Sequence, residues 1–474
     1  MEKYLYGASV QGIQEFIFKT NKLQEIIGAS EIVKEIDERI KKKLPKEYEK
    51  NIIINSAGNI KIIFDKKEDV QKIVLEFLKE LKQSAYGITV SQAVVKLGED
   101  YQENLQNYIN ELEKKLKVQR NIPDTPLDMS ISIMKLSPQT SRPAVRYAKE
   151  NKLLDMASSQ KREAYQKWFE RERKEKKEFE KYKDISSLSN HLKKIAIIHA
   201  DGNGLGELVP KLGKDLQTFS KELDEATKKA FSRAKEGKTK IRKIILGGDD
   251  MVAICSASEA LEFIEEYLKY FEEETSKIEV LKKHKDKLTA CAGIAYCNEK
   301  FPFHYAVGLA EELCSEAKKL SNREASAILF HNIQSASYQS WEKYIEDELT
   351  IKSDEETIFC NFGPYYLNKE GKPKIKDLKN IVLAYSEGDS VLSKLRRWIG
   401  ELHQNYQYAQ NLLNRIYALS TKEYNTAMDN NLKKLHSELS GKKLIVEIEK
   451  DKKTPIYDIL QIHSVTGRAK NDED

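Results

Sequence analysis

The chain has 474 residues, of which 33% are charged and 40% hydrophobic, and its net charge at pH 7 is +5. This length allows three or four domains, and the composition is typical of a soluble, globular protein with well-solvated helices. No apolar run approaches the length of a membrane span and the N-terminus lacks a signal-peptide pattern, so we expect a cytoplasmic protein without membrane contact. The five cysteines contain no C-x-x-C pair, which predicts reduced, mostly buried thiols and no zinc site.

The first 118 residues alternate strand-like apolar runs with amphipathic runs of helical period. The predicted elements are a strand over 3–10, a short helix from Gln11 to Phe18, a helix over 23–43, a hairpin over 52–64, a helix around 70–81, a strand over 88–97 and a helix ending near 116. This β-α-α-β-β-α-β-α order predicts one domain over residues 1–118.

Residues 119–190 are predicted to connect this domain to the next one. The first part, 121–144, is rich in Pro, Ser and Thr and is expected to form a loop. The second part, 149–182, is a charged helix in which acidic residues alternate with basic ones. A solvated helix face is therefore favoured over an RNA-binding groove.

The same order of elements returns at an offset of about 190 residues. The predicted elements are a strand over 194–201, a helix over about 205–230, a hairpin over 243–254, a helix over 258–276, a strand over 288–296 and a helix over 305–320. An internal duplication of this kind predicts two domains with one fold. We expect an α+β protein with two ferredoxin-like domains, 1–118 and 191–335, a helical connector over 119–190, and a mainly helical domain over 336–474 that ends in a disordered stretch from 466.

The hairpin of the second copy carries the tip Gly247-Gly248-Asp249-Asp250 between two β-branched runs. Such a turn needs a positive φ, which glycine supplies. Two adjacent carboxylates repel each other, which is costly unless a cation lies beside them. An ordinary Asp/Gly turn is the alternative interpretation.

The strand over 194–201 ends on an aspartate and runs into the glycine-rich sequence Asp201-Gly202-Asn203-Gly204-Leu205-Gly206. Amide groups at the start of a helix form an anion site, and glycine lets a phosphate approach the backbone. If this strand pairs with the hairpin, Asp201 and Asp249 meet at one end of the sheet. Two hard carboxylates beside a phosphate site suit Mg²⁺ carrying a nucleoside triphosphate. The two features together favour a metal-dependent nucleotide site over a structural turn.

The two copies differ at the positions where this chemistry would lie. Ser9 stands in the first copy where Asp201 stands in the second, and Ala57-Gly58-Asn59 replaces the Gly-Gly-Asp-Asp tip. We therefore expect only the second copy to hold a catalytic metal.

The pairing of D-G-N-G-L-G with G-G-D-D resembles the second palm domain of the large polymerase subunit of type III CRISPR effector complexes. The sequence from Gly12 to Phe18, followed by Gly28-Ala29-Ser30, is similar to that family's degenerate first palm. The stretch from Ala292 through Pro302 to Lys319 also resembles the family. The resemblance covers roughly residues 1–335, and more distantly the second palm resembles diguanylate cyclases and class III nucleotide cyclases.

The resemblance implies a nucleotidyltransferase that joins ATP, or other nucleoside triphosphates, into a cyclic oligoadenylate or cyclic dinucleotide messenger in antiviral defence. In this interpretation Asp201, Asp249 and the Gly202 carbonyl hold Mg²⁺ or Mn²⁺, and Asp250 lies on a second metal or in its shell. Lys318 or Lys319 neutralises the leaving pyrophosphate. The amides of Asn203, Gly204, Leu205 and Gly206 bind phosphates beside Gly247 and Gly248. The first palm offers an acceptor pocket made of Ser9, Gln11, Gly12, Ser56, Ala57, Gly58 and Asn59.

Two departures from the family matter. Large members carry an HD nuclease, but no histidine precedes His191, so we expect no HD activity. The four-cysteine zinc element between the palms is also missing. The competing hypothesis is a non-catalytic scaffold that binds nucleotides, RNA or CRISPR effector subunits. The small net charge and the interspersed basic residues permit RNA as a partner without favouring it, and the oligomeric state stays open.

Overall fold

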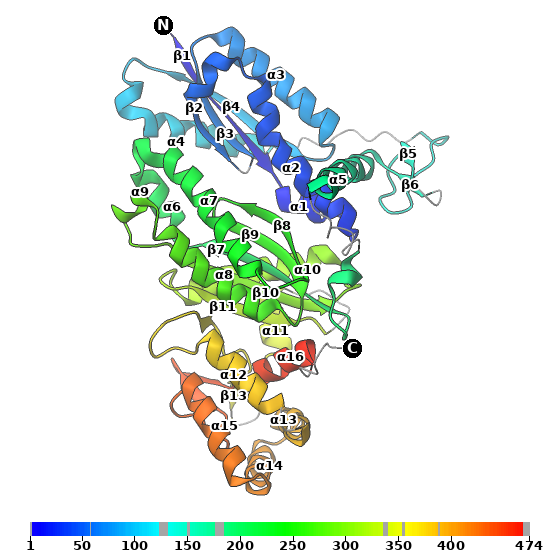
Figure 1. The fold of residues 1–474 in the computed structure, drawn as a ribbon, viewed down its shortest axis with the longest axis vertical. Helices are drawn as coiled ribbons and strands as arrows, with labels where there is room; N and C mark the ends of the chain where they lie inside the picture. Colours follow the sequence, from blue (N-terminus) through cyan, green and yellow to red (C-terminus); the bar gives the residue numbers. More distant parts are fainter. Residues whose placement is uncertain are drawn as a thin grey trace. The chain divides into compact units, whose positions relative to one another are not determined.

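The computed structural model describes residues 2–56, 58–122, 131–148, 152–175, 184–334, 340–352, 356–386 and 389–467 (Figure 1). The chain divides into two compact units. One contains Met1–Ser187 with Leu205–Glu225, and the other contains Leu188–Gly204 with Ala226–Asp474.

The first unit begins with the predicted antiparallel domain. Its elements are β1 (Lys3–Gln11), α1 (Ile13–Phe18), α2 (Leu23–Lys43), β2 (Ile52–Ser56), β3 (Asn59–Phe64), α3 (Lys67–Ser84), β4 (Thr89–Leu97) and α4 (Tyr101–Arg120), followed by β5 (Arg146–Tyr147), β6 (Leu153–Leu154) and α5 (Met156–Glu175). The sheet has the strand order β2-β3-β1-β4, which is the ferredoxin-like order. The predicted fold of this copy is confirmed.

Helices α3 and α4 cover opposite faces of this sheet. Leu112 of α4 packs with Leu5 and Val95, and Ala93 lies against the same cluster. The neighbouring Gln92 instead donates from Nε2 to the Val74 carbonyl of α3, 3.3 Å away. Because successive side chains of a strand point to opposite faces, the two helices lie on either side of β4.

The charged helix of the connector is α5. One face is solvated as expected, with Lys167, Arg173 and Lys174 exposed, but the other face is covered by α2, which was not predicted. This helix packs directly on α2: a Cβ added at Gly28 would lie 1.7 Å from the Lys161 carbonyl oxygen. The Lys161 side chain is buried and donates to the Phe16 carbonyl, and burial lowers the pKa of Lys161 to about 8. Two ion pairs join the helices, Arg162–Glu25 at 2.9 Å and Arg171–Glu31 at 2.8 Å. Some of the alternating charges of α5 thus serve helix–helix contact, and the others are exposed.

The second copy of the topology begins at β7 and extends the first. Its elements are β7 (Lys194–Gly202), α6 (Leu205–Leu208), α7 (Leu216–Lys235), β8 (Ile241–Gly247), β9 (Asp250–Ser256), α8 (Ala260–Thr275), α9 (Glu279–Lys282), β10 (Ala290–Asn298), α10 (Phe303–Leu320) and β11 (Ala327–Asn332). All belong to the second unit except α6 and the start of α7, which fall in the range Leu205–Glu225. The sheet order is β14-β11-β10-β7-β9-β8. The segment β10-β7-β9-β8 has the order of β4-β1-β3-β2, so the duplication is confirmed. Strand β11, parallel to β10, was not predicted, because a short apolar run does not distinguish strand from helix.

The predicted helix over 205–230 is interrupted. It consists of α6, two 3₁₀ turns at Val209–Lys211 and Gly213–Asp215, and then α7. Pro210 lacks an N–H for a helical hydrogen bond, and Gly213 has φ +49°, so the chain leaves the helical path here.

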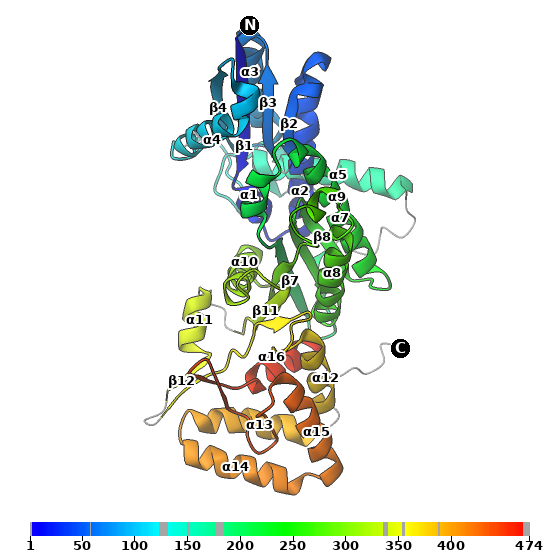
Figure 2. The same ribbon diagram turned by 90° about the vertical axis from the view of Figure 1, so that its left-hand side faces the viewer.

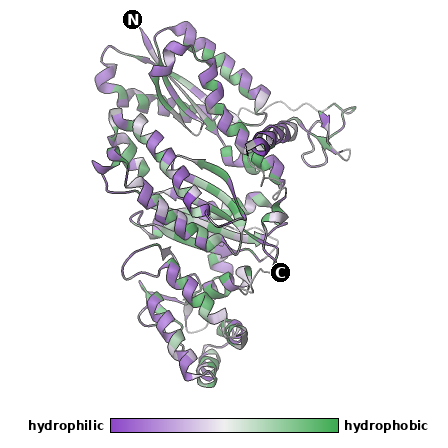
Figure 3. Ribbon diagram, viewed as in Figure 1, coloured by the Kyte–Doolittle hydropathy of each residue, from purple (hydrophilic) through white to green (hydrophobic). Residues whose placement is uncertain are grey.

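The core of the second unit lies around β7. The strands there are mainly hydrophobic, and the helices alternate hydrophobic and hydrophilic residues, as amphipathic helices do (Figure 3). Helix α10 approaches β10 closely, since a Cβ added at Gly293 would lie 2.0 Å from the Ala310 carbonyl oxygen. All five cysteines are free and buried, as predicted. No helix in the described part of the chain has both the length and the apolar character needed to cross a membrane.

The C-terminal part is mainly helical but also contains a small sheet (Figure 2). Its elements are α11 (Trp341–Asp347), β12 (Thr350–Lys352), β13 (Thr357–Phe359), β14 (Tyr365–Tyr366), α12 (Ile375–Ser386), α13 (Asp389–Leu402), α14 (Tyr406–Leu419), α15 (Lys422–Leu435), β15 (Val446–Ile448), β16 (Asp451–Lys453) and α16 (Ile456–Thr466). The sheet β12-β13-β16-β15 was not predicted, because three-residue strands leave no periodic signal. Thr466 ends α16, and residues 468–474 of the stretch expected to be disordered lie outside the described residues.

Two helical glycines, one in the α2–α5 contact and one with open space around it, are predicted to respond oppositely to replacement by alanine. Gly28→Ala should destabilise the protein, because the new methyl group meets backbone atoms of Lys161. Gly400→Ala, in α13 with nothing within 4 Å of its added Cβ, should stabilise it by about 0.5–1 kcal/mol. Urea unfolding of both variants measures the difference. Equal effects of the two substitutions would contradict the close packing.

The buried His331 of β11 predicts a loss of stability in acid. Its ring packs against Tyr344 with centroids 4.5 Å apart, neither ring nitrogen has a hydrogen-bond partner among the described residues, and burial lowers the pKa of His331 to about 3. The unfolded chain binds a proton near the ordinary value of 6.5, so stability is complete above that pH and falls between pH 6.5 and 3. At pH 5 the cost is about 2 kcal/mol.

His331→Phe should remove this part of the pH dependence. We expect the free energy of unfolding of the variant, relative to the native chain, to rise as the pH falls from 7.5 to 5. His304→Phe is the control, because His304 of α10 is exposed. A constant difference between His331→Phe and the native chain across this range would show that the ring is not kept neutral.

Candidate functional site

The register of β7 and β9 brings the predicted carboxylates together. The two strands are antiparallel, with Ala200 opposite Met251, so the next residue, Asp201, reaches the turn that precedes β9. There the carboxyl groups of Asp201 and Asp249 lie within hydrogen-bonding distance of each other. This contact is the one expected from the two motifs.

The Asp201–Asp249 contact is electrostatically costly for the chain on its own. Burial, the hydrogen bond with Asp201 and the charge of Asp201 all raise the pKa of Asp249. A carboxyl group in this position retains its proton more readily unless a cation compensates the charge. A positive charge beside this turn relieves that cost.

The turn itself has the expected geometry and an anchor that was not predicted. Gly247 ends β8 and pairs with Asp250, and Gly248 has φ +61°. The Thr227 hydroxyl of α7 donates to the Gly248 carbonyl at 2.5 Å, and Thr227 is fully buried. A polar residue within an apolar helix face was the available signal for this anchor.

Of the two candidate lysines, the structure places only Lys318 at the carboxylates. Its Nζ lies 2.5 Å from Asp201 Oδ2 and 2.8 Å from the Gly202 carbonyl oxygen. These two oxygens are the ones expected to bind metal. The neighbouring Lys319 pairs with Glu316 at 2.9 Å, and its side chain is 66% exposed.

Asp250 points to a histidine that the sequence analysis missed. Asp250 Oδ1 lies 3.2 Å from His199 Nε2. Burial alone lowers the pKa of His199, but the hydrogen bond to Asp250 and its charge outweigh burial, and the net pKa is raised. His199 precedes Asp201 by two residues, so both side chains lie on one face of β7. The two-residue spacing from Asp201 is the sequence signal by which His199 could have been found.

The glycine-rich loop after β7 is only partly open for phosphate, which corrects one expectation. The Asn203 backbone N–H donates to the Thr289 carbonyl at 2.8 Å, so it is not directed at a ligand. The Asn203 side chain is fully buried and its Nδ2 lies 3.0 Å from Thr289 Oγ1. Gly204, with φ +79°, and Gly206 have nothing within 4 Å of an added Cβ. Leu205 begins α6, a helix of four residues.

In the first copy, uncharged polar groups replace the carboxylates at the equivalent positions. Ser9 of β1 lies opposite Asn59 of β3, and its hydroxyl donates to Asn59 Oδ1 at 2.7 Å. Arg120 Nη2 donates to the same hydroxyl at 3.3 Å, and Gln11 Nε2 donates to Ser91 Oγ.

The remaining residues of the predicted acceptor pocket are backbone positions of the same region. Gly12 has φ +59° and precedes α1, and Gly58 has φ +75° with its carbonyl accepting from the Val10 N–H. Ser56 ends β2, and Ala57 lies outside the described residues. An acceptor role for this set stays a prediction.

Comparison with protein families matches residues 194–327 to the second palm domain of Cas10/Cmr2. Among solved structures, the Csm1–Csm4 cassette in complex with cA4 is 14% identical, with a TM-score of 0.55, covering 98% of this chain and 70% of that chain. The cassette with pppApApA is 13% identical with a TM-score of 0.57, and the cassette with one ATP is 15% identical with a TM-score of 0.52, at the same coverage. No curated protein matches. Residues 194–327 are therefore similar to the second palm domain of Cas10/Cmr2, and the chain has the fold of Csm1.

The carboxylate contact predicts that the metal-free chain gains stability from its removal. Asp249→Asn should raise the Tm in EDTA at pH 8 by at least about 2 °C. The raised pKa of Asp249 means that its protonated form favours the folded state, so its stabilising contribution is lost as the pH rises from the ordinary value of 3.8. The gain should therefore shrink toward pH 5.

Asp286→Asn is the matched control for this prediction, because Asp286 is exposed. Differential scanning calorimetry of the three proteins at pH 5 and pH 8 measures the effect. A lower Tm for Asp249→Asn at pH 8 would show that the contact stabilises the free protein.

Proposed function

We propose that this chain is a metal-dependent nucleotidyltransferase that joins ATP, or another nucleoside triphosphate, into a cyclic oligonucleotide messenger in CRISPR-related defence. The observation that carries the proposal is the contact of Asp201 with Asp249 beside the Lys318 ammonium. The likeness to structures of Csm1 with ATP and with cA4 supports the same class of substrate and product. A cyclic oligoadenylate and a cyclic dinucleotide are both compatible with the site.

The residues present fit a hard divalent cation. The described residues contain no group of three or more His, Cys, Asp or Glu side chains arranged to hold a metal. The protein would therefore supply only a few of the ligands of a cation. Two carboxylates, from Asp201 and Asp249, and the Gly202 carbonyl would supply it. Mg²⁺ is commonly bound in this way, through one or two carboxylates with water and substrate phosphates as the other ligands. Mn²⁺ accepts the same oxygen donors.

The proposed reaction is a nucleotidyl transfer. The ribose hydroxyl oxygen of one nucleotide forms a bond to the α-phosphorus of another, the bond from that phosphorus to the β-phosphate oxygen breaks, and pyrophosphate leaves. The hydroxyl proton passes to water. A bound Mg²⁺ or Mn²⁺ neutralises the triphosphate and lowers the pKa of the attacking hydroxyl. A second transfer within the linear product closes the ring.

Lys318 is assigned to the triphosphate. Its ammonium now binds Asp201 Oδ2 and the Gly202 carbonyl oxygen, so it occupies the ligands of the cation. With a cation on those oxygens, the Lys318 ammonium would be free to contact the phosphates, where it would stabilise the charge of the leaving pyrophosphate. Asp250, held by His199, supports the turn from the other side.

Partner subunits follow from the same comparison. The matched structures contain Csm1 together with Csm4, and we propose that this chain also assembles with effector subunits. The alternative function, a scaffold without catalysis, is separated from the enzyme by the experiment below.

Turnover is tested with purified protein, Mg²⁺ or Mn²⁺ and each labelled nucleoside triphosphate, with products separated by chromatography and identified by mass spectrometry. We expect a cyclic product that Asp249→Asn reduces by about 10²-fold or more, since it loses a metal ligand. Binding of ATP without turnover would point to a missing activator. Neither binding nor turnover would favour the scaffold.

The two neighbouring lysines give a matched pair for the role of Lys318. Lys318→Met should lower turnover by at least about tenfold, because it removes the ammonium next to Asp201. Lys319→Met should leave turnover within about twofold, because Lys319 pairs with Glu316 at the surface. Steady-state rates at saturating metal measure both. Equal losses in the two variants would remove Lys318 from the mechanism.

A further inference from the structure

We propose that the free edge of β4 in the first unit is a docking site for an extended segment of a partner protein, which adds to the sheet as a further strand. This inference does not depend on the proposed catalysis. It rests on the backbone of β4, on the groove beside it and on the equivalent edge in the second unit.

The outward backbone groups of β4 are identified by the pairing of β1. The Val10 N–H donates to the Gly58 carbonyl on the β3 side, so every second residue of β1 from Val10 bonds toward β3. Their partners on β4 therefore direct N–H and C=O away from the sheet. These partners are Val90, Gln92, Val94 and Lys96.

The Val94 carbonyl, one of these outward groups, accepts a hydrogen bond from a side chain in place of a neighbouring strand. Lys115 Nζ donates to the Val94 carbonyl at 3.3 Å. A flexible lysine thus provides the donor that a neighbouring strand would provide through its backbone. Among the described residues β4 is the last strand of its sheet. An unpaired edge of this length is a template for strand addition.

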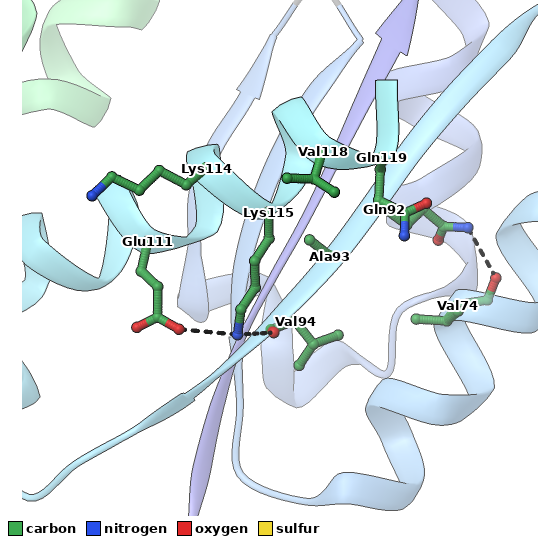
Figure 4. Close-up of a pocket in the computed structure, with 9 residues that line it drawn as sticks. All are labelled: Val74, Gln92, Ala93, Val94, Glu111, Lys114, Lys115, Val118 and Gln119. Atoms are coloured by element: carbon green, nitrogen blue, oxygen red, sulfur yellow. Dashed lines mark hydrogen bonds and ion pairs between the residues drawn. The ribbon is translucent and has the colours of Figure 1, made fainter. Parts of the chain in front are cut away.

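A groove runs along this edge between the two flanking helices (Figure 4). Its volume is about 520 Å³, within the range of about 300–1,000 Å³ of ligand pockets. Val74 of α3 lines one side, Val118 of α4 the other, and Val94 lies on the strand between them. Val118 is 64% exposed. The groove therefore offers apolar contacts on both sides of an incoming backbone.

The second unit shows that the equivalent edge of this fold accepts a strand. Strand β10 holds the position of β4 in the repeated order, and its outer edge pairs in parallel with β11, from Cys291–Ala327 to Tyr296–Asn332. Strand β11 is a short, fully buried, largely apolar segment. The first unit has the same scaffold, and no described residue of it pairs with the outer edge of β4.

The groove selects an extended acidic and apolar segment rather than a second copy of this chain. Helices α3 and α4 flank the edge, and a second β4 edge would bring its own two helices into the same space. A symmetric pair would also face Lys114 and Lys115 with the same two lysines. Glu111 pairs with Lys115 at 2.9 Å, so the two lysines and one glutamate leave the lining positive. A carboxylate on the incoming segment complements that charge.

The test is selection of a random dodecapeptide library displayed on phage against the full chain, followed by Kd measurements on the selected peptides by fluorescence anisotropy. Val94→Pro removes only an outward N–H, so it blocks pairing and leaves the β1–β4 bonds in place. Lys114→Glu reverses the charge without touching the backbone. Lys117→Glu, on the same helix and outside the groove lining, is the control.

We expect peptides that alternate apolar and acidic residues and slow the amide hydrogen exchange of Val90, Gln92, Val94 and Lys96. Val94→Pro and Lys114→Glu should each raise Kd by at least about tenfold, while Lys117→Glu should not. Circular dichroism melting shows whether Val94→Pro folds, and Lys114→Glu carries the test if it does not. No enriched peptide, or peptides unaffected by both variants, would overturn the proposal. Dimerisation of the chain that Lys114→Glu alters would assign the edge to a second copy.

Discussion

Two carboxyl groups in contact, those of Asp201 and Asp249, are the constraint on which the candidate site of the second unit depends. Three features of the scaffold hold them in place against their repulsion: a buried β7, a turn with positive φ at Gly248, and a buried hydrogen bond from Thr227. The Lys318 ammonium supplies compensating charge in the free protein. The stability of the scaffold therefore holds the carboxylates in a geometry that they would not adopt by themselves.

The duplication separates what the fold requires from what the chemistry requires. Both copies keep the same strand order and a glycine with positive φ at the hairpin tip, Gly58 in one and Gly248 in the other. Only the second keeps the acidic side chains. In the first, the Ser9 hydroxyl bonds to Asn59 and Arg120, so the equivalent place is satisfied by the protein's own groups. The same backbone thus supports a pair of carboxylates in one copy and a site without carboxylates in the other.

The sequence was sufficient for features that leave a local or periodic signal. Strand and helix periods gave the fold of both copies, and the two aspartate motifs gave the Asp201–Asp249 contact. Features that arise from tertiary contact were not predictable in this way. His199 and Thr227 meet the site only through strand pairing and helix packing. The Asn203 N–H is used by the Thr289 carbonyl, just before β10, and Lys161 of α5 is buried against the first domain by donating to the Phe16 carbonyl. In each case a distant segment decides which group remains available.

The same reasoning explains why the two copies differ at the edge as well as at the hairpin. In the second unit β11 pairs with the outer edge of β10, the strand in which Cys291 lies opposite Asp201. In the first unit the equivalent strand flanks Ser9 through Ser91, where no repelling carboxylates have to be held, and the edge can remain open. Because this strand does not have to hold such a site, its edge can serve another role. The exposed valine and lysines beside it are available for contact with a partner.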